Sequence, residues 1–205
     1  MTDAIREYWD TQAKDFDQEA DHGLRDPAVR RAWADLILPL IPGPGSDVAD
    51  LGCGTGSLSL LLAEAGHRVR GLDLSARMVE AAQAKAARAA AAGGFPPQAA
   101  VDFLQGDASE PPYPPASCDV VLARHVVWAL PDQDAALGRW ARLLRGTGTM
   151  VLVEGLWGTG AGIPAQECRD LVLRHRRHAD VVPLTDPALW GKEISDERYL
   201  ILSRS

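Results

Sequence analysis

The spacing of hydrophobic and polar positions changes repeatedly between two periods from residue 46 onward. Short strand-like runs occupy residues 48–51, 67–72, 101–104, 119–123 and 150–153. Between several of them, apolar residues recur at helical spacing, as in residues 58–65, 77–92 and 132–145. Strands that alternate with helices are typical of a parallel sheet covered by helices. The pattern therefore predicts an α/β fold with a Rossmann-like sheet and helices on both faces.

The ends of the predicted helices carry matching signals. Ser75 precedes one helix as an N-cap residue, and Gly66 ends the helix before it. Toward the end of the chain, residues 164–178 predict a further helix, and residues 181–184 and 198–202 predict two more strands. Two strands at the edge of a parallel sheet allow one of them to run antiparallel. We therefore expect a mostly parallel sheet of seven strands.

The first 45 residues have a different character. Asp26 followed by Pro27 predicts the start of a helix that continues to Pro42. Ahead of it, aromatic residues lie among charges with no core period, so we expect this arm to fold over another part of the protein. The predicted organisation is a helical lid over residues 1–45 and a ligand-binding core over residues 46–205.

Composition and charge restrict the class of protein. The chain has 205 residues, of which 46% are hydrophobic and 24% are charged, which favours one globular domain over a disordered or fibrous chain. A formal charge of −7 makes nucleic acid and anionic membranes poor partners for the whole chain. Residues 174–178, Arg-His-Arg-Arg-His, form one local basic run. It is the feature that would favour a macromolecular partner.

Other features concern location. The sequence lacks an apolar stretch of the ~18 residues that a membrane-spanning helix needs. Its first ten residues carry three acids where a signal peptide would be basic and then apolar. Cys53, Cys118 and Cys168 are widely spaced and odd in number, which is unlike a disulfide framework or a metal site. We expect a cytoplasmic protein with no membrane span.

The segment from Asp50 to Gly56, Asp-Leu-Gly-Cys-Gly-Thr-Gly, lies between a predicted strand and a predicted helix. Glycines there let the backbone approach a ligand closely, and the free amides of a helix start favour an electron-rich group. Dinucleotide-binding folds place their third glycine where this chain has Ser57, which counts against NAD. Asp73, after the second strand, is placed to accept hydrogen bonds from both hydroxyls of a ribose. The pairing predicts a nucleoside ligand; the alternative is a glycine turn with Asp73 capping the next helix.

These residues resemble the core of the class I S-adenosylmethionine-dependent methyltransferases, of the type that acts on small molecules. The resemblance covers residues 46–130 and rests on the glycine segment, on Gly-Leu-Asp-Leu-Ser at residues 71–75 and on Gly-Asp-Ala at residues 106–108. It implies a seven-stranded sheet with a final hairpin across residues 46–204. The implied cofactor is S-adenosylmethionine, and the implied product is S-adenosylhomocysteine.

The resemblance also implies a set of cofactor contacts. Asp73 would hold the ribose, Asp107 would accept from the adenine amine, and the amide of Ala108 would lie close to the ring. An acid that only closes a turn is the alternative for Asp107, and a core position is the alternative for Met78. The remaining implied contacts are those of Gly52, Gly54 and Gly56 with the methionine and ribose, Asp50 with the loop amides or the ammonium, and Leu74 and Met78 with the adenine faces.

The residues after the fourth predicted strand are candidates for both walls of the site, because ligands bind at these strand ends in open α/β sheets. Arg124 is the candidate for the cofactor wall and His125 for the acceptor wall. A histidine titrates near neutral pH, so His125 is a candidate general base. Its alternative is a capping or packing role. Trp128 is expected to form an apolar wall of the pocket.

Residues 8–17 are similar to the opening segment of small-molecule methyltransferases, in which an aromatic residue leans on the cofactor. Phe16 stands here where Tyr is more usual, which removes a hydroxyl donor, and Tyr8 is the candidate to replace it. Trp9 belongs to the same segment, and His22 faces either the pocket or solvent. Tyr8, Trp9, Phe16, His22 and Trp128 are therefore the candidate acceptor-side residues.

The predicted reaction is an in-line displacement that moves a methyl group to an oxygen or nitrogen of a small molecule. Positioning supplies up to ~7–11 kcal/mol, more than the ~3–5 kcal/mol expected from a general base. Asp132 and Asp134 lack a third oxygen ligand, so we expect no metal. A macromolecular acceptor and a non-catalytic cofactor-binding subunit remain alternatives. The oligomeric state, monomer or homodimer, stays open.

Overall fold

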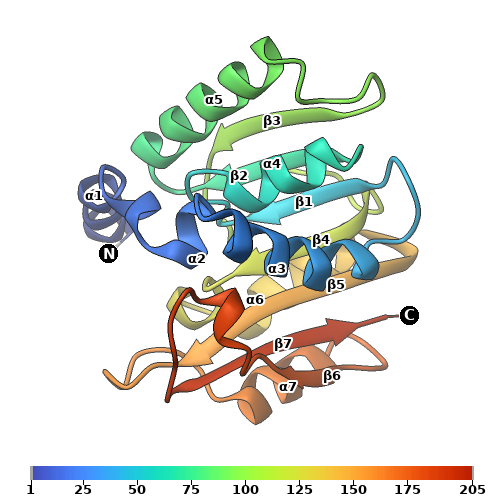
Figure 1. Ribbon diagram of the computed structural model, residues 1–205. Helices are drawn as coiled ribbons and strands as arrows, with labels where there is room; N and C mark the ends of the chain where they lie inside the picture. Colours follow the sequence, from blue (N-terminus) through green and yellow to red (C-terminus); the bar gives the residue numbers. More distant parts are fainter. Residues whose placement is uncertain (1, 205) are drawn as a thin grey trace.

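The computed structural model describes residues 2–204 and contains one seven-stranded sheet (Figure 1). The strand order is β3-β2-β1-β4-β5-β7-β6, in which β7 runs antiparallel to both of its neighbours and the other pairings are parallel. The predicted fold is thereby confirmed. The strands are β1 (Asp47–Leu51), β2 (Arg68–Asp73), β3 (Ala100–Gln105), β4 (Cys118–Arg124), β5 (Leu144–Leu156), β6 (Asp180–Pro183) and β7 (Glu197–Ser203).

Helices cover both faces of the sheet, because successive strand residues point to opposite sides. Val48 packs with α3 (Pro27–Ile37) and α4 (Ser57–Glu64), whereas its neighbour Ala49 packs with α6 (Gln133–Leu143) and α7 (Ala165–Leu173). Buried side chains on both faces explain the nearly continuous apolar runs of the central strands. The α-helices are α1 (Thr2–Gln12), α2 (Ala20–Gly23), α3 (Pro27–Ile37), α4 (Ser57–Glu64), α5 (Ala76–Ala91), α6 (Gln133–Leu143) and α7 (Ala165–Leu173), with short 3-10 turns η1 (Phe16–Gln18), η2 (Leu38–Leu40), η3 (Val127–Ala129) and η4 (Pro187–Leu189).

The predicted N-caps are confirmed. Ser75 Oγ accepts a hydrogen bond from the Met78 amide at 3.1 Å, and Asp26 Oδ1 accepts from the Ala28 amide at 2.7 Å. Asp132 caps α6 in the same way. Each cap satisfies a backbone donor that the first helical turn leaves free.

Three boundaries differ from the sequence prediction. Helix α3 ends at Ile37 and is followed by the 3-10 turn η2 rather than continuing to Pro42. Helix α7 ends at Leu173 rather than at residue 178, and β5 begins at Leu144 rather than at residue 150. The residues after α7 bond to neighbouring elements instead of continuing the helix, since Arg176 donates to the Gly148 carbonyl at 2.6 Å. Tertiary contacts here outweigh local helix propensity.

The first 45 residues divide into two parts by packing. In α3, Trp33 is fully buried, and its Nε1 donates to the Leu189 carbonyl at 2.7 Å. Its ring lies 5.6 Å from that of Trp190, so α3 covers the sheet together with α4. Residues 2–24, which we call the lid segment, lie instead beside the glycine segment and the start of α5.

Polar side chains attach the lid segment to the core. Asp10 Oδ1 accepts a hydrogen bond from Ser75 Oγ at 2.5 Å, at the N-terminus of α5. Asp17 Oδ2 lies 2.8 Å from Lys85 Nζ, which also bonds to Thr55 Oγ1 at 2.9 Å. Asp10 therefore binds the N-cap residue of α5 and Asp17 binds a side chain of that helix, and Asp17 also contacts the glycine segment through Thr55.

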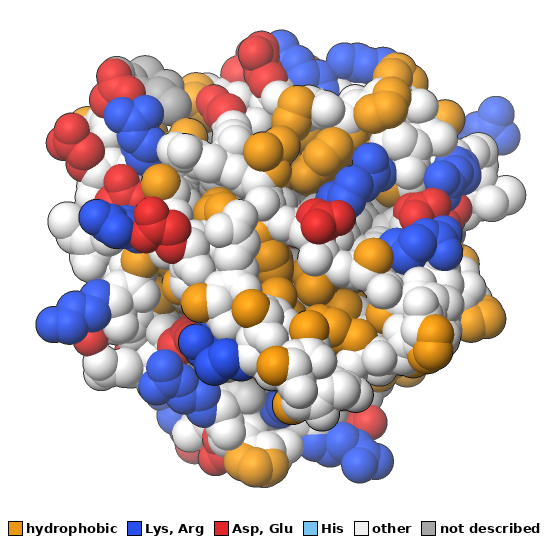
Figure 2. Space-filling view, turned by 90° about the horizontal axis from the view of Figure 1, so that it is seen from above, with side chains coloured by type: hydrophobic (Ala, Val, Ile, Leu, Met, Phe, Trp, Pro, Cys, Tyr) orange, Lys and Arg blue, Asp and Glu red, His pale blue; other side chains and the backbone are white. Residues whose placement is uncertain are grey.

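Surface features are consistent with a mixed charge pattern. Figure 2 shows the side that lies uppermost in Figure 1, where positive and negative side chains are interspersed with apolar ones rather than gathered by sign. None of the helices among residues 2–204 has the length and apolar character that crossing a bilayer requires. All three cysteines are free thiols.

Candidate active site

A cavity of about 450 Å³ lies at the carboxyl ends of the central strands and under the lid segment. It gathers most of the residues singled out from the sequence, although they come from separate parts of the chain. These lining residues are Trp9, Phe16, His22, Asp50, Gly52, Gly54, Asp73, Leu74, Met78, Asp107, Ala108, Arg124, His125 and Trp128.

The glycine segment needs its glycines for two separate reasons. Gly52 has φ +75°, a left-handed conformation, and a Cβ there would lie 2.3 Å from Val126 Cγ2. A Cβ on Gly54 would lie 3.0 Å from the ring of Phe16. The amide of Gly52 donates to the Leu72 carbonyl at 2.7 Å, which fixes the turn against β2. The backbone therefore faces the cavity at close range between the lid segment and the residue after His125.

Two carboxylates flank this turn. Asp73 Oδ2 accepts from the Gly54 amide at 2.8 Å, and Oδ1 accepts from the Ser75 amide at 2.9 Å. Burial raises the pKa of Asp73, whereas these amide bonds oppose the rise. Each oxygen retains a lone pair, so the carboxylate has the acceptors that a ribose diol requires. Asp50 is 2% exposed, accepts from Ser59 Oγ, and has its pKa raised to about 6 by burial.

The far side of the cofactor end is mostly apolar. Met78 is 1% exposed and lines the cavity together with Leu74. Asp107 Oδ1 accepts from the Ser109 amide at 2.8 Å, which holds the carboxylate at the cavity wall beside Ala108. A flat heterocycle with one exocyclic amine has both apolar contact and an acceptor here.

The other end of the cavity centres on His125. Its φ is +61°, which is unusual for a residue other than glycine, and its side chain is 12% exposed. Neither ring nitrogen has a hydrogen-bond partner among residues 2–204. Burial lowers the pKa of His125, and Asp21 only partly opposes that effect. The imidazole is therefore neutral at pH 7, the form in which it accepts a proton.

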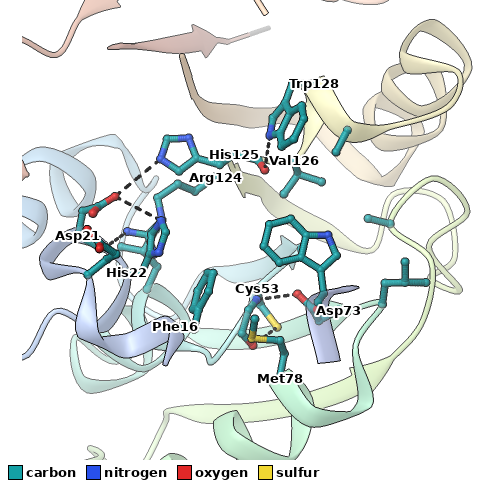
Figure 3. Close-up of a pocket in the computed structure, with 18 of the residues that line it drawn as sticks. Phe16, Asp21, His22, Cys53, Asp73, Met78, Arg124, His125, Val126 and Trp128 are labelled. Atoms are coloured by element: carbon teal, nitrogen blue, oxygen red, sulfur yellow. Dashed lines mark hydrogen bonds and ion pairs between the residues drawn. The ribbon is translucent and has the colours of Figure 1, made fainter. Parts of the chain in front are cut away.

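Asp21 and His22 of the lid segment face this histidine (Figure 3). Asp21 Oδ2 lies 3.5 Å from His22 Nε2 and 3.9 Å from His125 Nε2. Burial by itself would raise the pKa of Asp21, but the neighbouring imidazoles and the Arg124 guanidinium outweigh it and lower the pKa below the usual range. Burial lowers the pKa of His22 to about 4. The cluster thus holds one carboxylate between two neutral imidazoles.

Arg124 lines the cavity as predicted but also attaches the lid. Its guanidinium donates to the backbone carbonyl of Asp21 and lies 5.1 Å from the ring centroid of Trp33. Burial lowers the pKa of Arg124, with nearby carboxylates opposing the change. The side chain therefore connects α3, the lid segment and the end of β4.

Sequence reasoning missed several residues at the acceptor end. Trp157 follows β5, and its ring lies 5.2 Å from that of His125 and 5.4 Å from that of Trp128. Trp190 and Arg198 also line the cavity, and the Arg198 guanidinium lies 4.8 Å from the Trp190 ring. Asp21 is another missed residue, and it could have been found from the sequence because it directly precedes the candidate residue His22. The other three belong to no local pattern.

Two predicted site residues do not line the cavity. The side chain of Tyr8 is 56% exposed, so it does not replace the hydroxyl that Phe16 lacks. Gly56, with φ +77°, starts α4, and a Cβ there would lie 2.7 Å from the ring of Phe103. Its absent side chain permits close packing of helix and sheet rather than ligand contact.

The acidic pair weighed for metal binding also lies outside the cavity. Asp132 caps α6, and Asp134 Oδ1 lies 2.9 Å from His175 Nε2. Within the cavity, by contrast, the ligand atoms of Asp21, His22 and His125 all lie within 4.8 Å of one another.

Residues 49–152 match the family described as "Methyltransferase domain". The chain belongs to the class I S-adenosylmethionine-dependent methyltransferase family. Among curated relatives of this chain, nocamycin O-methyltransferase of Saccharothrix syringae is 34% identical over 165 residues, which are 78% of this chain and 52% of that protein. The 27-O-demethylrifamycin SV methyltransferase of Amycolatopsis mediterranei is 30% identical over 192 residues, 86% of this chain and 65% of that one.

A solved structure shows the same fold over the whole chain. Magnesium protoporphyrin IX methyltransferase from Synechocystis PCC 6803, solved with bound S-adenosylmethionine, superposes with a TM-score of 0.71 at 24% identity, covering 100% of this chain and 97% of that chain. The chain spans about half the length of the curated relatives it matches. The resemblance drawn from the glycine segment is thus confirmed for family and fold.

Proposed function

We propose that this chain transfers the methyl group of S-adenosylmethionine to an oxygen or nitrogen of a small molecule by in-line displacement. The observation that carries the proposal is one cavity that joins the glycine segment and Asp73 to a buried, neutral His125. The names of two relatives, nocamycin O-methyltransferase and 27-O-demethylrifamycin SV methyltransferase, support an oxygen acceptor. Residues 2–24 serve as the lid in this proposal.

The described residues fit the cofactor. The backbone at Gly52 leaves no room for a Cβ and that at Gly54 leaves little, which matches the close approach that a cradle for the methionine part requires. Asp73 would accept from the ribose hydroxyls and Asp107 from the adenine amine, between the apolar side chains named above. When bound, the cofactor supplies an electrophilic methyl group on sulfur.

His125 would act on the acceptor. As a neutral imidazole it takes the proton of an acceptor hydroxyl while an oxygen lone pair forms the new bond to carbon, or it takes the proton of an acceptor ammonium and so frees the nitrogen lone pair that forms this bond. Alignment in the cavity supplies the larger share of the rate, and a base adds roughly 10²–10⁴-fold. Loss of the imidazole in His125→Ala should therefore slow turnover by about this factor without abolishing it.

A binding measurement tests the cofactor. S-adenosylhomocysteine at 100 times its dissociation constant should stabilise the protein by ~2.7 kcal/mol, roughly 5–10 °C in Tm. NAD is the matched control and should leave Tm unchanged. The absence of a shift with S-adenosylhomocysteine would end the proposal.

A turnover measurement tests the chemistry. The protein is incubated with methyl-labelled S-adenosylmethionine and a panel of phenols, enols, carboxylic acids and amines. Labelled small-molecule product supports an enzyme, whereas binding without product across the panel and a metabolite extract supports a cofactor-binding subunit. Product analysis then gives the acceptor atom.

The basic run does not favour a macromolecular acceptor. Arg174 Nη1 and His175 Nε2 lie 3.5 and 2.9 Å from Asp134 Oδ1, and Arg176 bonds to the Gly148 carbonyl. These side chains make contacts within the chain, and they lie outside the cavity lining. The oligomeric state and cytoplasmic location stay predictions.

A further inference from the structure

We infer that the lid segment carries part of the catalytic machinery: Asp21 holds the Nε2–H of His125, so that Nδ1 of the imidazole takes the acceptor proton only when the lid lies over the cavity. This inference rests on the proposed function. It makes Asp21 a positioning residue, which acts through His125 rather than on the acceptor itself.

The geometry places the carboxylate where such a role needs it. Asp21 is 6% exposed, and its Oδ2 lies 3.9 Å from His125 Nε2, a separation that a small rotation of either side chain converts into a hydrogen bond. Catalytic hydrogen bonds are often long before substrate binds. The backbone carbonyl of Asp21 accepts from Arg124, which fixes this part of the lid against the core.

The unpaired state of the imidazole points the same way. A buried polar atom without a hydrogen bond is destabilising, and both nitrogens of His125 are in that state among residues 2–204. One nitrogen is satisfied by Asp21, and the other by the acceptor proton. The left-handed backbone of His125 is maintained by Glu154, whose Oε1 accepts from the Val126 and Val127 amides at 2.8 and 2.7 Å.

The charges around His125 define the role of Asp21. Arg124 and Arg198 disfavour an imidazolium, His22 is neutral, and Asp21 is the carboxylate that faces the ring. The Arg124 guanidinium also opposes a divalent cation among Asp21, His22 and His125, although their ligand atoms are close enough to share one. A dyad of acid and imidazole therefore fits this charge balance better than a metal site.

The step balances in atoms and charge. The acceptor oxygen or nitrogen forms a bond to the methyl carbon, the carbon–sulfur bond breaks, and sulfur keeps the electron pair as a neutral thioether. The proton of the acceptor moves to Nδ1 of His125. The positive charge lost from sulfur thus appears on the imidazole, beside the carboxylate of Asp21.

The first test needs no acceptor. ¹⁵N-histidine NMR of the S-adenosylhomocysteine-saturated protein resolves the five histidines, and His125→Gln assigns the signal. In the unaltered protein we expect a neutral His125 with its proton on Nε2. Asp21→Asn should lower the pKa of His125, because the arginines are then unopposed, and should shift the proton toward Nδ1. The control Asp15→Asn removes an exposed lid carboxylate and should change neither property.

The second test uses the first acceptor that gives product. Asp21→Asn should lower kcat by roughly 10²-fold and move the acidic limb of the pH profile to lower pH, with the dissociation constant of S-adenosylhomocysteine unchanged. Identical NMR titrations and pH profiles for Asp21→Asn and the unaltered protein would overturn the dyad while leaving methyl transfer intact. Joint shifts of the His22 and His125 signals on adding Co²⁺ would replace the dyad by a metal site.

Discussion

The two ends of the cavity are built differently. The cofactor end comes mainly from one stretch, residues 50–78, with two residues after β3. The acceptor end takes side chains from the lid segment, from the turn after β4, from the end of β5 and from residues 190–198. A ligand shared by many proteins needs a local backbone device, whereas an acceptor site is assembled from distant segments that can vary separately.

The comparison predicts that the cofactor end binds its ligand independently of the acceptor end. Asp73→Ala removes two charge-assisted hydrogen bonds of about 1.5–3 kcal/mol each, so the dissociation constant of S-adenosylhomocysteine should rise by at least ~100-fold. Calorimetry measures it. Asp102→Ala, an exposed acid on β3, is the control. Equal affinity for Asp73→Ala and the unaltered protein would contradict the assignment of the ribose site.

The contact between Gly52 and Val126, where the two ends of the cavity meet, should give the next largest effect. Gly52→Ala adds a Cβ to a residue with a left-handed φ, which should cost about 1–2 kcal/mol of stability. The same Cβ clashes with Val126, which should cost about 1–3 kcal/mol more. Gly43→Ala separates the two costs, because its φ is +73° and nothing lies within 4 Å of its Cβ. Urea unfolding should show the larger loss of stability for Gly52→Ala. Equal losses would mean that Val126 moves aside freely.

The attachment of the lid segment gives a smaller effect. Lys85→Met removes the closer cation of Asp17, at 2.8 Å in a mostly buried site, and leaves the mostly exposed Arg25 guanidinium at 3.7 Å. The loss should cost about 2 kcal/mol and speed amide exchange in residues 2–24. Lys192→Met is the matched control. Its pair with Glu19, 3.3 Å apart, is more than half exposed and should contribute less than about 1 kcal/mol. Equal exchange rates in both variants would show that the buried pair does not hold the lid.

The turn that carries His125 makes stability depend on pH. Burial raises the pKa of Glu154 from 4.5 to about 8, so between these values the folded protein binds a proton that the unfolded chain has lost. The free energy of unfolding therefore falls as pH rises through this window. Glu154→Gln should remove that fall. Compared with the unaltered protein, its free energy of unfolding should rise by about 2 kcal/mol more at pH 7 than at pH 5, which is measured as a smaller pH dependence of Tm.

Glu193→Gln, an exposed acid, is the control for this measurement and should match the unaltered protein at both pH values. S-adenosylhomocysteine affinity should stay within about two-fold in Glu154→Gln, because the side-chain oxygen of Gln can accept the same Val126 and Val127 amide hydrogen bonds and keep the turn in place. A parallel pH dependence in Glu154→Gln and the unaltered protein would show that Glu154 is ionised in the fold.

Residues of the cofactor end could be predicted from the sequence more completely than residues of the acceptor end. Residues 50–56 and Asp73 were recognisable because the turn, the strand and the helix that hold them are neighbours in sequence. Trp157 and Trp190 were not recognisable, since the aromatic residues that they contact lie in distant parts of the chain. Tyr8 shows the converse error: an aromatic residue in the right segment faces solvent, because the helix phase of α1 was not evident from the sequence.

The chain by itself determined the order of strands and helices, the capped helix starts and the nucleoside-binding turn, because these depend on periods and spacings within some twenty residues. The tertiary structure alone decided which side chains share the acceptor end. Asp21 and His125 are separated by a hundred residues, and only packing of the lid segment against the sheet edge brings the carboxylate within 3.9 Å of the imidazole. Burial then sets their protonation, which neither residue type fixes without its surroundings.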